Sequence, residues 1–174
     1  MHSNRRKLQR FLTDTWLLRT VIRRLAPSVP CFRFKEQAAY LTGAEKHGLR
    51  VMSRMGRMLQ YREQTAVYLD ATGESCLDCL IEFYEHGERA HALAHSHPGW
   101  GEDAIWESPT DVRFLGPVQE KARADMIGLI VSRPDQKGLA YIHFWTVCVP
   151  FEMHIFGNGL KVVDRRHHVY AIEV

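Results

Sequence analysis

The sequence has 174 residues, of which 45% are hydrophobic and 25% charged, with a formal net charge of +3 at pH 7. This length fits one domain, residues 1–174, and the composition is that of a globular protein with a core. The small net charge does not indicate nucleic-acid binding, and no stretch approaches the roughly 20 apolar residues that cross a bilayer. We therefore expect neither a nucleic acid nor a membrane as partner.

The amino terminus and the cysteines bear on the cellular compartment. The chain begins Met-His-Ser-Asn-Arg-Arg-Lys, and neither an uninterrupted apolar region nor a small-residue cleavage site follows. The four cysteines are too few and too irregularly spaced for a secreted disulfide framework. We therefore expect a cytoplasmic protein.

The first element along the chain is predicted to be a basic amphipathic helix from Asn4 to Ala26, with no strand ahead of it. Pro27 and Pro30 end this helix. We interpret its arginines as solvated, with an acidic partner surface as the alternative. Its apolar residues recur at helical spacing and are Leu8, Phe11, Leu12, Leu18, Ile22 and Leu25.

Three strands and a second helix are predicted next. The helix covers Glu74 to His86, and Gly87 suits the position after its last turn. Cys76 and Cys79 share a face with Leu80, so we interpret the two cysteines as core residues rather than half of a zinc site. The three strands are predicted at Cys31 to Thr42, Leu49 to Tyr61 and Thr65 to Asp70.

A strand from Arg89 to Ser96 and a loop from Gly99 to Glu107 lead to a third helix, which begins after Ser108 and reaches about Ala124. The rest of the chain is rich in strands. Together these elements predict an α/β (α+β) domain, with a mixed sheet of six or more strands flanked by helices. The remaining predicted strands are Met126 to Ser132, Leu139 to Val149, Phe151 to Phe156, Leu160 to Val163 and His168 to Val174.

The run Ala-His-Ser-His-Pro contains the most informative pair of residues. His95 and His97 stand two positions apart in a predicted strand, so both imidazoles point to one face. A catalytic zinc needs three protein ligands and an open position for water. Asp111, in the first turn of the next helix, can supply the third ligand, and Ser108 can cap that helix. Each feature alone is more typical of packing or of a helix start; the combination is rarer.

These residues resemble the signature of the JAMM (MPN+, JAB domain) zinc metalloprotease family, which reads His-x-His-Pro, a loop, then Ser-x-x-Asp. The family also has an upstream glutamate followed seven positions later by a glycine, which Glu36 and Gly43 match. Ala39 stands where the family commonly has a second glycine, and the loop of nine residues before Ser108 is longer than usual. The resemblance covers roughly residues 6–141 and implies a JAB/MPN-like (cytidine-deaminase-like) fold.

The resemblance also implies a role for each site residue. His95, His97 and Asp111 would hold Zn²⁺, Glu36 would act as general base, and Ser108 would stabilise the oxyanion.

Other carboxylates are weaker candidates. Glu45 precedes a predicted loop and Glu63 lies in a predicted turn, so Glu36 is preferred as the base. Glu102 and Asp103 lie in the loop without the helix cap that fixes Asp111. Trp100 and Trp106 bracket that loop, and we interpret them as substrate contacts, with packing as the alternative.

Family members with a complete motif cleave isopeptide or peptide bonds after the C-terminus of ubiquitin or a ubiquitin-like protein. Compact members resembling this chain occur in bacterial operons that encode ubiquitin-like conjugation enzymes, including anti-phage systems. The resemblance therefore implies a deubiquitinase-like metallopeptidase, with a ubiquitin-like substrate and with activating- and conjugating-enzyme-like proteins as partners. Two alternatives stay open: a non-catalytic MPN-like scaffold, and a metallohydrolase that processes sulfur-carrier proteins or small amides.

Overall fold

A computed structural model describes residues 7–27, 33–64, 69–120 and 125–174 of the chain. Helices and strands alternate irregularly along the chain. In chain order they are β1 (Gln9–Asp14), α1 (Thr15–Leu25), β2 (Ala38–Gly43), β3 (Glu45–Lys46), β4 (Leu49–Val51), β5 (Arg54–Met58), β6 (Tyr61–Gln64), β7 (Leu69–Ala71), α2 (Gly73–Glu85), β8 (Arg89–Trp100), the 3₁₀ turn η2 (Glu102–Ala104), α3 (Pro109–Glu120), β9 (Ile127–Arg133), β10 (Leu139–Trp145), β11 (Phe151–Phe156), β12 (Leu160–Asp164) and β13 (Val169–Glu173).

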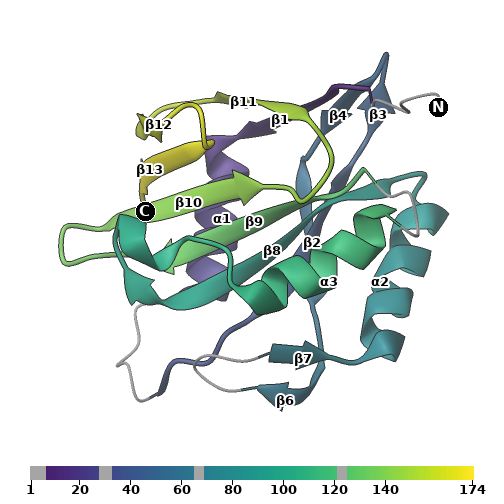
Figure 1. Cartoon of the computed structure of the whole chain (residues 1–174), viewed down its shortest axis with the longest axis horizontal. Coiled ribbons are helices and arrows are strands. Elements are labelled where there is room, and N and C mark those ends of the chain that lie inside the picture. The colour runs from purple at the N-terminus through teal and green to yellow at the C-terminus, as the bar shows by residue number, and fades with distance from the viewer. Residues whose placement is uncertain (1–6, 28–32, 65–68, 121–124) are drawn as a thin grey trace.

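The architecture is mixed α+β, as the sequence predicts. The main sheet has seven strands in the order β12-β13-β10-β9-β8-β2-β5, and only its β8–β9 pair is parallel among the pairings described. A second sheet of four strands has the order β11-β1-β4-β3, and β6 and β7 pair with each other. Helix α1 lies behind the main sheet and α3 lies in front of it (Figure 1).

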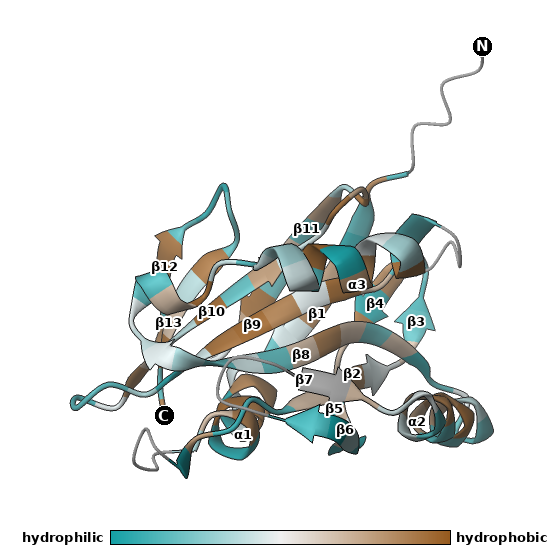
Figure 2. Ribbon diagram, turned by 60° about the horizontal axis from the view of Figure 1, so that its bottom comes forward, coloured by the Kyte–Doolittle hydropathy of each residue, from teal (hydrophilic) through white to brown (hydrophobic). Residues whose placement is uncertain are grey.

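The main sheet separates two hydrophobic cores. On one face α1 packs Leu18 and Ile22 against Leu129 and Ile142. On the other face, residues of α2 and α3 such as Phe83 and Leu115 join the buried side chains of the sheet. All seven residues of β9 are buried, because both faces of this central strand are covered. The hydrophobic colour in Figure 2 accordingly lies on central strands, while the turn between β9 and β10 is hydrophilic.

The predicted helix from Asn4 to Ala26 is wrong over its first half, where the chain forms β1. This strand pairs in parallel with both β11 and β4. The helix begins only at Thr15, because Asp14 caps it by accepting a hydrogen bond from the backbone N–H of Leu17 at 2.7 Å. Leu8, placed on the predicted buried stripe, is 47% exposed. Asn4 to Arg6 lie outside the described residues.

The predicted strand from Leu49 to Tyr61 is divided among three strands. The chain leaves the four-stranded sheet after β4, and it joins the seven-stranded sheet at β5. The side chain of Met52, at the crossing, is buried in the core beneath α1. The predicted strand starting at Cys31 begins only at Ala38. Cys31 itself, Thr65 to Tyr68 of the next predicted strand, and the end of the third predicted helix near Ala124 lie outside the described residues.

Helix α2 forms where predicted, but Leu80 faces solvent with 42% exposure. Cys79 is buried as expected, and Cys76 is partly buried. The helix is oriented by Phe83, whose ring lies in edge contact with Tyr40, the ring centroids being 6.4 Å apart. Gly56 leaves room for that ring, since an added Cβ there would lie 2.6 Å from Phe83 Cζ.

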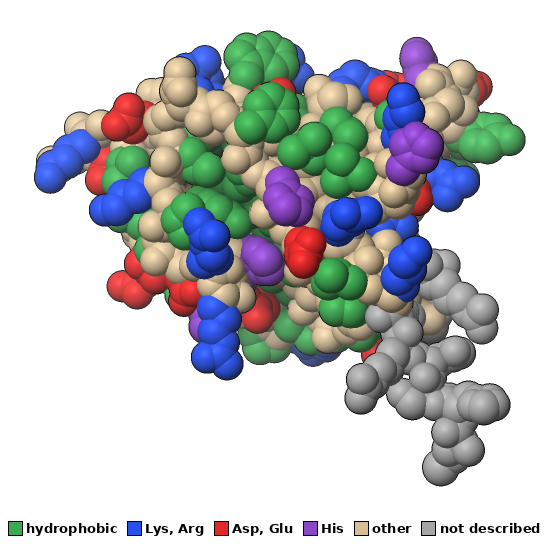
Figure 3. Space-filling view, turned by 90° about the horizontal axis from the view of Figure 1, so that it is seen from above, with side chains coloured by type: hydrophobic (Ala, Val, Ile, Leu, Met, Phe, Trp, Pro, Cys, Tyr) green, Lys and Arg blue, Asp and Glu red, His purple; other side chains and the backbone are tan. Residues whose placement is uncertain are grey.

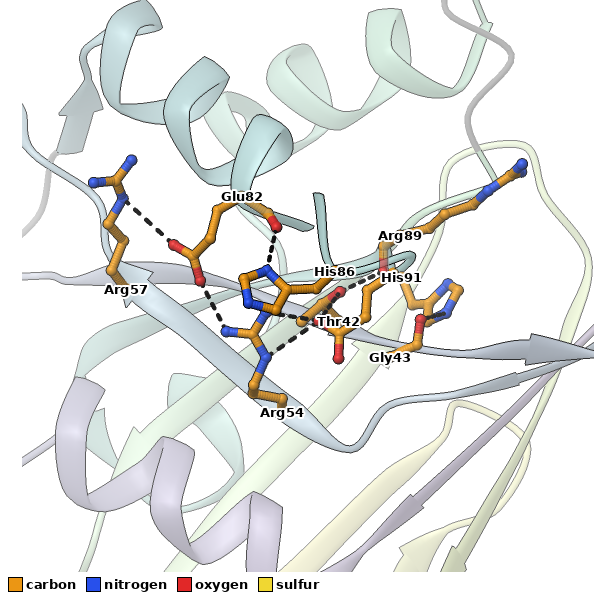
Figure 4. Close-up of polar contacts among 9 residues, drawn as sticks. Thr42, Gly43, Arg54, Arg57, Glu82, His86, Arg89 and His91 are labelled. Atoms are coloured by element: carbon orange, nitrogen blue, oxygen red, sulfur yellow. Dashed lines mark hydrogen bonds and ion pairs between the residues drawn. The ribbon is translucent and has the colours of Figure 1, made fainter. Parts of the chain in front are cut away.

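Ion pairs hold the same helix against β5. Arg54 contacts Glu82 at 2.9 Å and Glu88 at 2.6 Å, and Arg57 reaches Glu82 at 4.0 Å (Figure 4). Thr42 Oγ1 donates a hydrogen bond to the carbonyl oxygen of Arg89 at 2.8 Å on the adjoining strands. The face of α2 that turns inward is therefore fixed by partners far away in sequence.

The face shown in Figure 3 mixes charges of both signs with hydrophobic side chains, without a large area of one sign. This agrees with the small net charge. Among the described residues, no helix has the length and apolar character needed to cross a membrane.

Candidate metal centre

Strand β8 places the two histidines. Side chains alternate along it, so Ala94 and Ser96 are fully buried toward α1, while His95 and His97 point to the opposite face. The two imidazoles are 12% and 16% exposed, which leaves them largely shielded but reachable. The predicted common face of the pair is therefore present in the structure.

Helix α3 supplies the third candidate ligand through a reciprocal cap. The backbone N–H of Ser108 donates to Asp111 Oδ2 at 2.7 Å, and the backbone N–H of Asp111 donates to Ser108 Oγ at 3.3 Å. This is the capping-box arrangement, in which two unsatisfied N–H groups at a helix start are paired. Pro109 occupies the first helical position, where its missing N–H has no consequence. The cap fixes the direction of the Asp111 carboxylate.

Three candidate ligand atoms converge. His95 Nε2 lies 3.1 Å from His97 Nε2 and 3.2 Å from Asp111 Oδ1, and His97 Nε2 lies 3.6 Å from Asp111 Oδ2. Tetrahedral zinc, with bonds of about 2.0–2.2 Å, separates its ligand atoms by roughly 3.3 Å. The three side chains therefore fit a zinc ion with little rearrangement. They form the one group within the described residues whose ligand atoms could hold a metal in this way.

The loop before α3 fixes the tautomer of His97. Its Nδ1 lies 3.0 Å from the carbonyl oxygen of Ala104 in η2. A carbonyl oxygen can only accept, so Nδ1 carries the proton and the lone pair of the neutral ring is on Nε2. A hydrogen bond from the ring nitrogen that does not face the metal is typical of histidines that bind metals.

The electrostatics of the three side chains are coupled. Burial alone raises the pKa of Asp111, but hydrogen bonds from His95 and His97 outweigh burial and hold that pKa well below its usual range. Burial alone lowers the pKa of His97, yet its contact with Asp111 outweighs burial and raises the pKa. The carboxylate is thus ionised across the neutral pH range, as a ligand must be.

Glu36 lies beside the candidate ligands because of the register between β2 and β8. Ala38 pairs with His95 in antiparallel fashion, so Glu36, two residues before Ala38, comes level with His97. The backbone of Gln37 continues this pairing, donating to Ser96 Oγ at 3.1 Å and accepting from Ser96 N–H at 3.0 Å.

Glu36 is only 8% exposed. Burial raises its pKa to about 7, although His97 acts in the opposite direction and Asp111 adds to the increase. A carboxyl group with a pKa near neutrality can both accept and return a proton at physiological pH. This property is what a general base and acid requires.

One pocket of about 250 Å³ joins these groups. Glu36, Ser108 and the three candidate ligands all line it, together with other residues of α3 and of the main sheet. The structure therefore brings together all five residues that the sequence assigns to metal binding and catalysis.

The two tryptophans are not part of that pocket lining. Trp100 is 51% exposed and stacks on the guanidinium of Arg133, while Trp106 is 40% exposed and packs against the ring of His143. Their contact with substrate stays a prediction.

The rival carboxylates lie elsewhere. Glu45 pairs with Arg50 at the four-stranded sheet, and Glu63 lies on β6. Glu102 and Asp103 form the exposed part of η2. None of the four lines the pocket.

Sequence reasoning missed two supporting groups, the carbonyl oxygen of Ala104 and the hydroxyl of Ser96. Every residue type has a backbone carbonyl, so the sequence gives no sign that Ala104 contacts His97. Ser96 lies between the two histidines. A small polar residue at a buried strand position is the sequence feature that could have indicated its hydrogen bond to Gln37.

Comparisons with known proteins bear on the fold. No protein-family model and no curated protein matches the sequence. Among solved structures, the chain is similar to the solution structure of protein DSY2949 from Desulfitobacterium hafniense, with a TM-score of 0.54 and 14% identity. The match covers 83% of this chain and 94% of that one. At this level of identity the likeness concerns the fold alone.

Proposed function

We propose that the protein is a zinc-dependent peptidase of the JAMM type, with a JAB/MPN-like fold, acting in the cytoplasm. The observation that carries this proposal is the convergence of three ligand atoms, all within 4.8 Å of one another, in the pocket that also contains Glu36 and Ser108. His95, His97 and Asp111 would hold the ion. When bound, zinc acts as a Lewis acid and lowers the pKa of a water molecule toward about 7.

Glu36 and Ser108 would carry the proton transfers and the charge. The Glu36 carboxylate takes a proton from the attacking water and passes it to the leaving amine, a role that suits its pKa of about 7. Ser108 Oγ accepts its hydrogen bond from Asp111 N–H, so its own proton is free to be donated to the developing oxyanion of the substrate. One such donor is worth about 3 kcal/mol in other acyl-transfer enzymes.

The substrate class follows from the family resemblance. We propose that the enzyme cleaves after the C-terminus of a ubiquitin-like protein, in deconjugation or in precursor processing. An extended tail of this kind could pair with a sheet edge, because its backbone groups can continue a ladder of hydrogen bonds. The activating- and conjugating-enzyme-like proteins that form such substrates would be its functional partners.

The test has two independent parts. Purified protein should bind one zinc ion per chain, and the double variant His95→Ala/His97→Ala should bind none. Zinc-loaded protein should cleave fusions of a ubiquitin-like protein, while Glu36→Gln should keep its zinc and lose cleavage. Zinc binding without any cleavage would favour the scaffold, and absence of zinc binding would refute the metal centre.

A further inference from the structure

The pocket extends beyond the candidate metal centre as a hollow with an apolar lining. Its walls past the ligands are formed mainly by Leu59, Leu93, Phe114, Leu115 and Trp145. The charged groups that line the pocket all stand at the end occupied by Glu36 and the candidate ligands. A ligand in the rest of the hollow would therefore meet hydrocarbon rather than charge.

Small residues on the sheet create this hollow. Leu93 pairs with Gly128 on β9, and Ala38 lies on the neighbouring strand β2. Leu93 is only partly buried although β8 is a central strand. Gly128 also lets the indole of Trp145 lie against β9, since an added Cβ would stand 2.2 Å from Nε1. The depth of the hollow is thus built into the strand sequences.

We propose that this hollow is the subsite for a bulky apolar side chain, carried by the residue that follows the scissile amide. The inference rests on the proposed peptidase function. A tail that ends in glycine brings no side chain to the bond, so a side chain entering the hollow belongs to the leaving group. Burial of a charged side chain there would be costly, because the lining away from the candidate ligands offers no group of opposite charge.

The far wall of the hollow bears on whether the enzyme cleaves a peptide bond or an isopeptide bond. Leu59, Leu115 and Trp145 are at most 5% exposed, so the hollow ends against the protein core. The stem of a conjugated lysine must continue to the polypeptide that carries it and would need an exit. A leucine or phenylalanine side chain ends within the hollow. The geometry therefore favours the processing of a precursor in which an apolar residue follows the glycine.

Binding to the zinc-free protein tests the subsite without any cleavage. The probes are acetyl-Gly-Gly-Leu-amide and acetyl-Gly-Gly-Phe-amide, with the alanine and aspartate analogues as controls. The chain has four tryptophans, and the indole N–H signal missing from Trp145→Phe identifies Trp145 in ¹H–¹⁵N spectra. We expect the leucine and phenylalanine peptides to bind about tenfold more tightly than the alanine peptide, because several additional methylene groups are buried. They should also shift the Trp145 signal.

Two variants of the lining and one control variant make the test specific. Ala71→Leu fills the hollow from its partly exposed rim and should lower affinity for the leucine peptide at least about tenfold. Ala44→Leu, at an exposed position outside the pocket, should leave it unchanged. Phe114→Ala removes a wall residue that is 45% exposed, and should also weaken binding without loss of the fold.

Equal affinity for the leucine and alanine peptides would overturn the inference, as would unchanged binding in a folded Phe114→Ala variant. Failure of the peptidase proposal would look different. The zinc-loaded protein would then cleave nothing, while the zinc-free protein kept its preference for apolar peptides.

Discussion

Nδ1 of His97 donates a hydrogen bond to the carbonyl oxygen of Ala104, over 3.0 Å. The sequence-based interpretation assigned the loop from Gly99 to Glu107 only substrate contacts, through Trp100 and Trp106. The structure instead joins this loop to a candidate ligand. Ile105, which follows Ala104 in this loop, is fully buried, and its carbonyl oxygen lies 3.1 Å from His143 Nδ1. The loop is therefore anchored to both β8 and β10.

Deleting Glu102 to Ala104 should lower zinc affinity about 10–100-fold, because His97 loses the partner that orients its ring. Competition with a chromogenic chelator measures this change. Glu102→Ala, which alters only an exposed side chain of the same turn, is the matched control and should bind zinc normally. If the folded deletion variant bound zinc with normal affinity, the loop would have no part in metal binding, as the sequence-based interpretation has it.

Ser108→Ala should impair both stability and chemistry. Loss of the cap is expected to lower the free energy of unfolding by about 1 kcal/mol, as for other serine caps. Loss of the oxyanion donor should lower kcat by about 10²–10³-fold. Urea unfolding and steady-state kinetics separate the two effects. Ser108→Thr retains the hydroxyl and should recover most of the stability; a fully active Ser108→Ala variant would remove Ser108 from the mechanism.

Glu36→Gln should stabilise the zinc-free protein at high pH. Burial raises the folded-state pKa of Glu36 from 4.5 to about 7, so folding favours the protonated form. The stabilisation that protonated Glu36 provides is complete below its unfolded-state pKa of 4.5. It is lost as the pH rises through the folded-state pKa of about 7. Wild type and Glu36→Gln should therefore be similarly stable at pH 4.

At pH 8 the variant should be more stable by on the order of 2–3 kcal/mol. Urea unfolding at the two pH values, after zinc has been removed, measures the difference. Glu102→Gln, which changes an exposed carboxylate, is the control. A stability difference that does not depend on pH would show that Glu36 titrates normally.

Gly56→Ala should destabilise the fold by about 1–3 kcal/mol, because the new Cβ would stand 2.6 Å from Phe83 Cζ and push α2 from the sheet. Gly73→Ala is the matched control, since an added Cβ there meets no atom within 4 Å. Thermal unfolding measures both. Equal stability of the two variants would contradict the inward position of Phe83.

The sequence by itself determined the features that depend on local spacing. Alternation along a strand put His95 and His97 on one face, and the Ser-Pro start of a helix put Asp111 in its first turn. The same local rules located α2, most strands of the second half and the mixed α+β class. These predictions held because the physical cause, backbone periodicity or a cap, lies within a few residues of the feature.

Only the tertiary structure decided what depends on distant partners. Residues 9–14 have helical spacing, but pairing with β11 and β4 makes them a strand. The inward face of α2 is chosen by Phe83 packing into the space at Gly56, and Leu80 of the same helix is left facing solvent. Glu36 comes level with His97 through the register of β2 and β8, and Ala104 reaches His97 through a backbone carbonyl. Strand register and backbone contacts are set by long-range packing, which local sequence patterns do not encode.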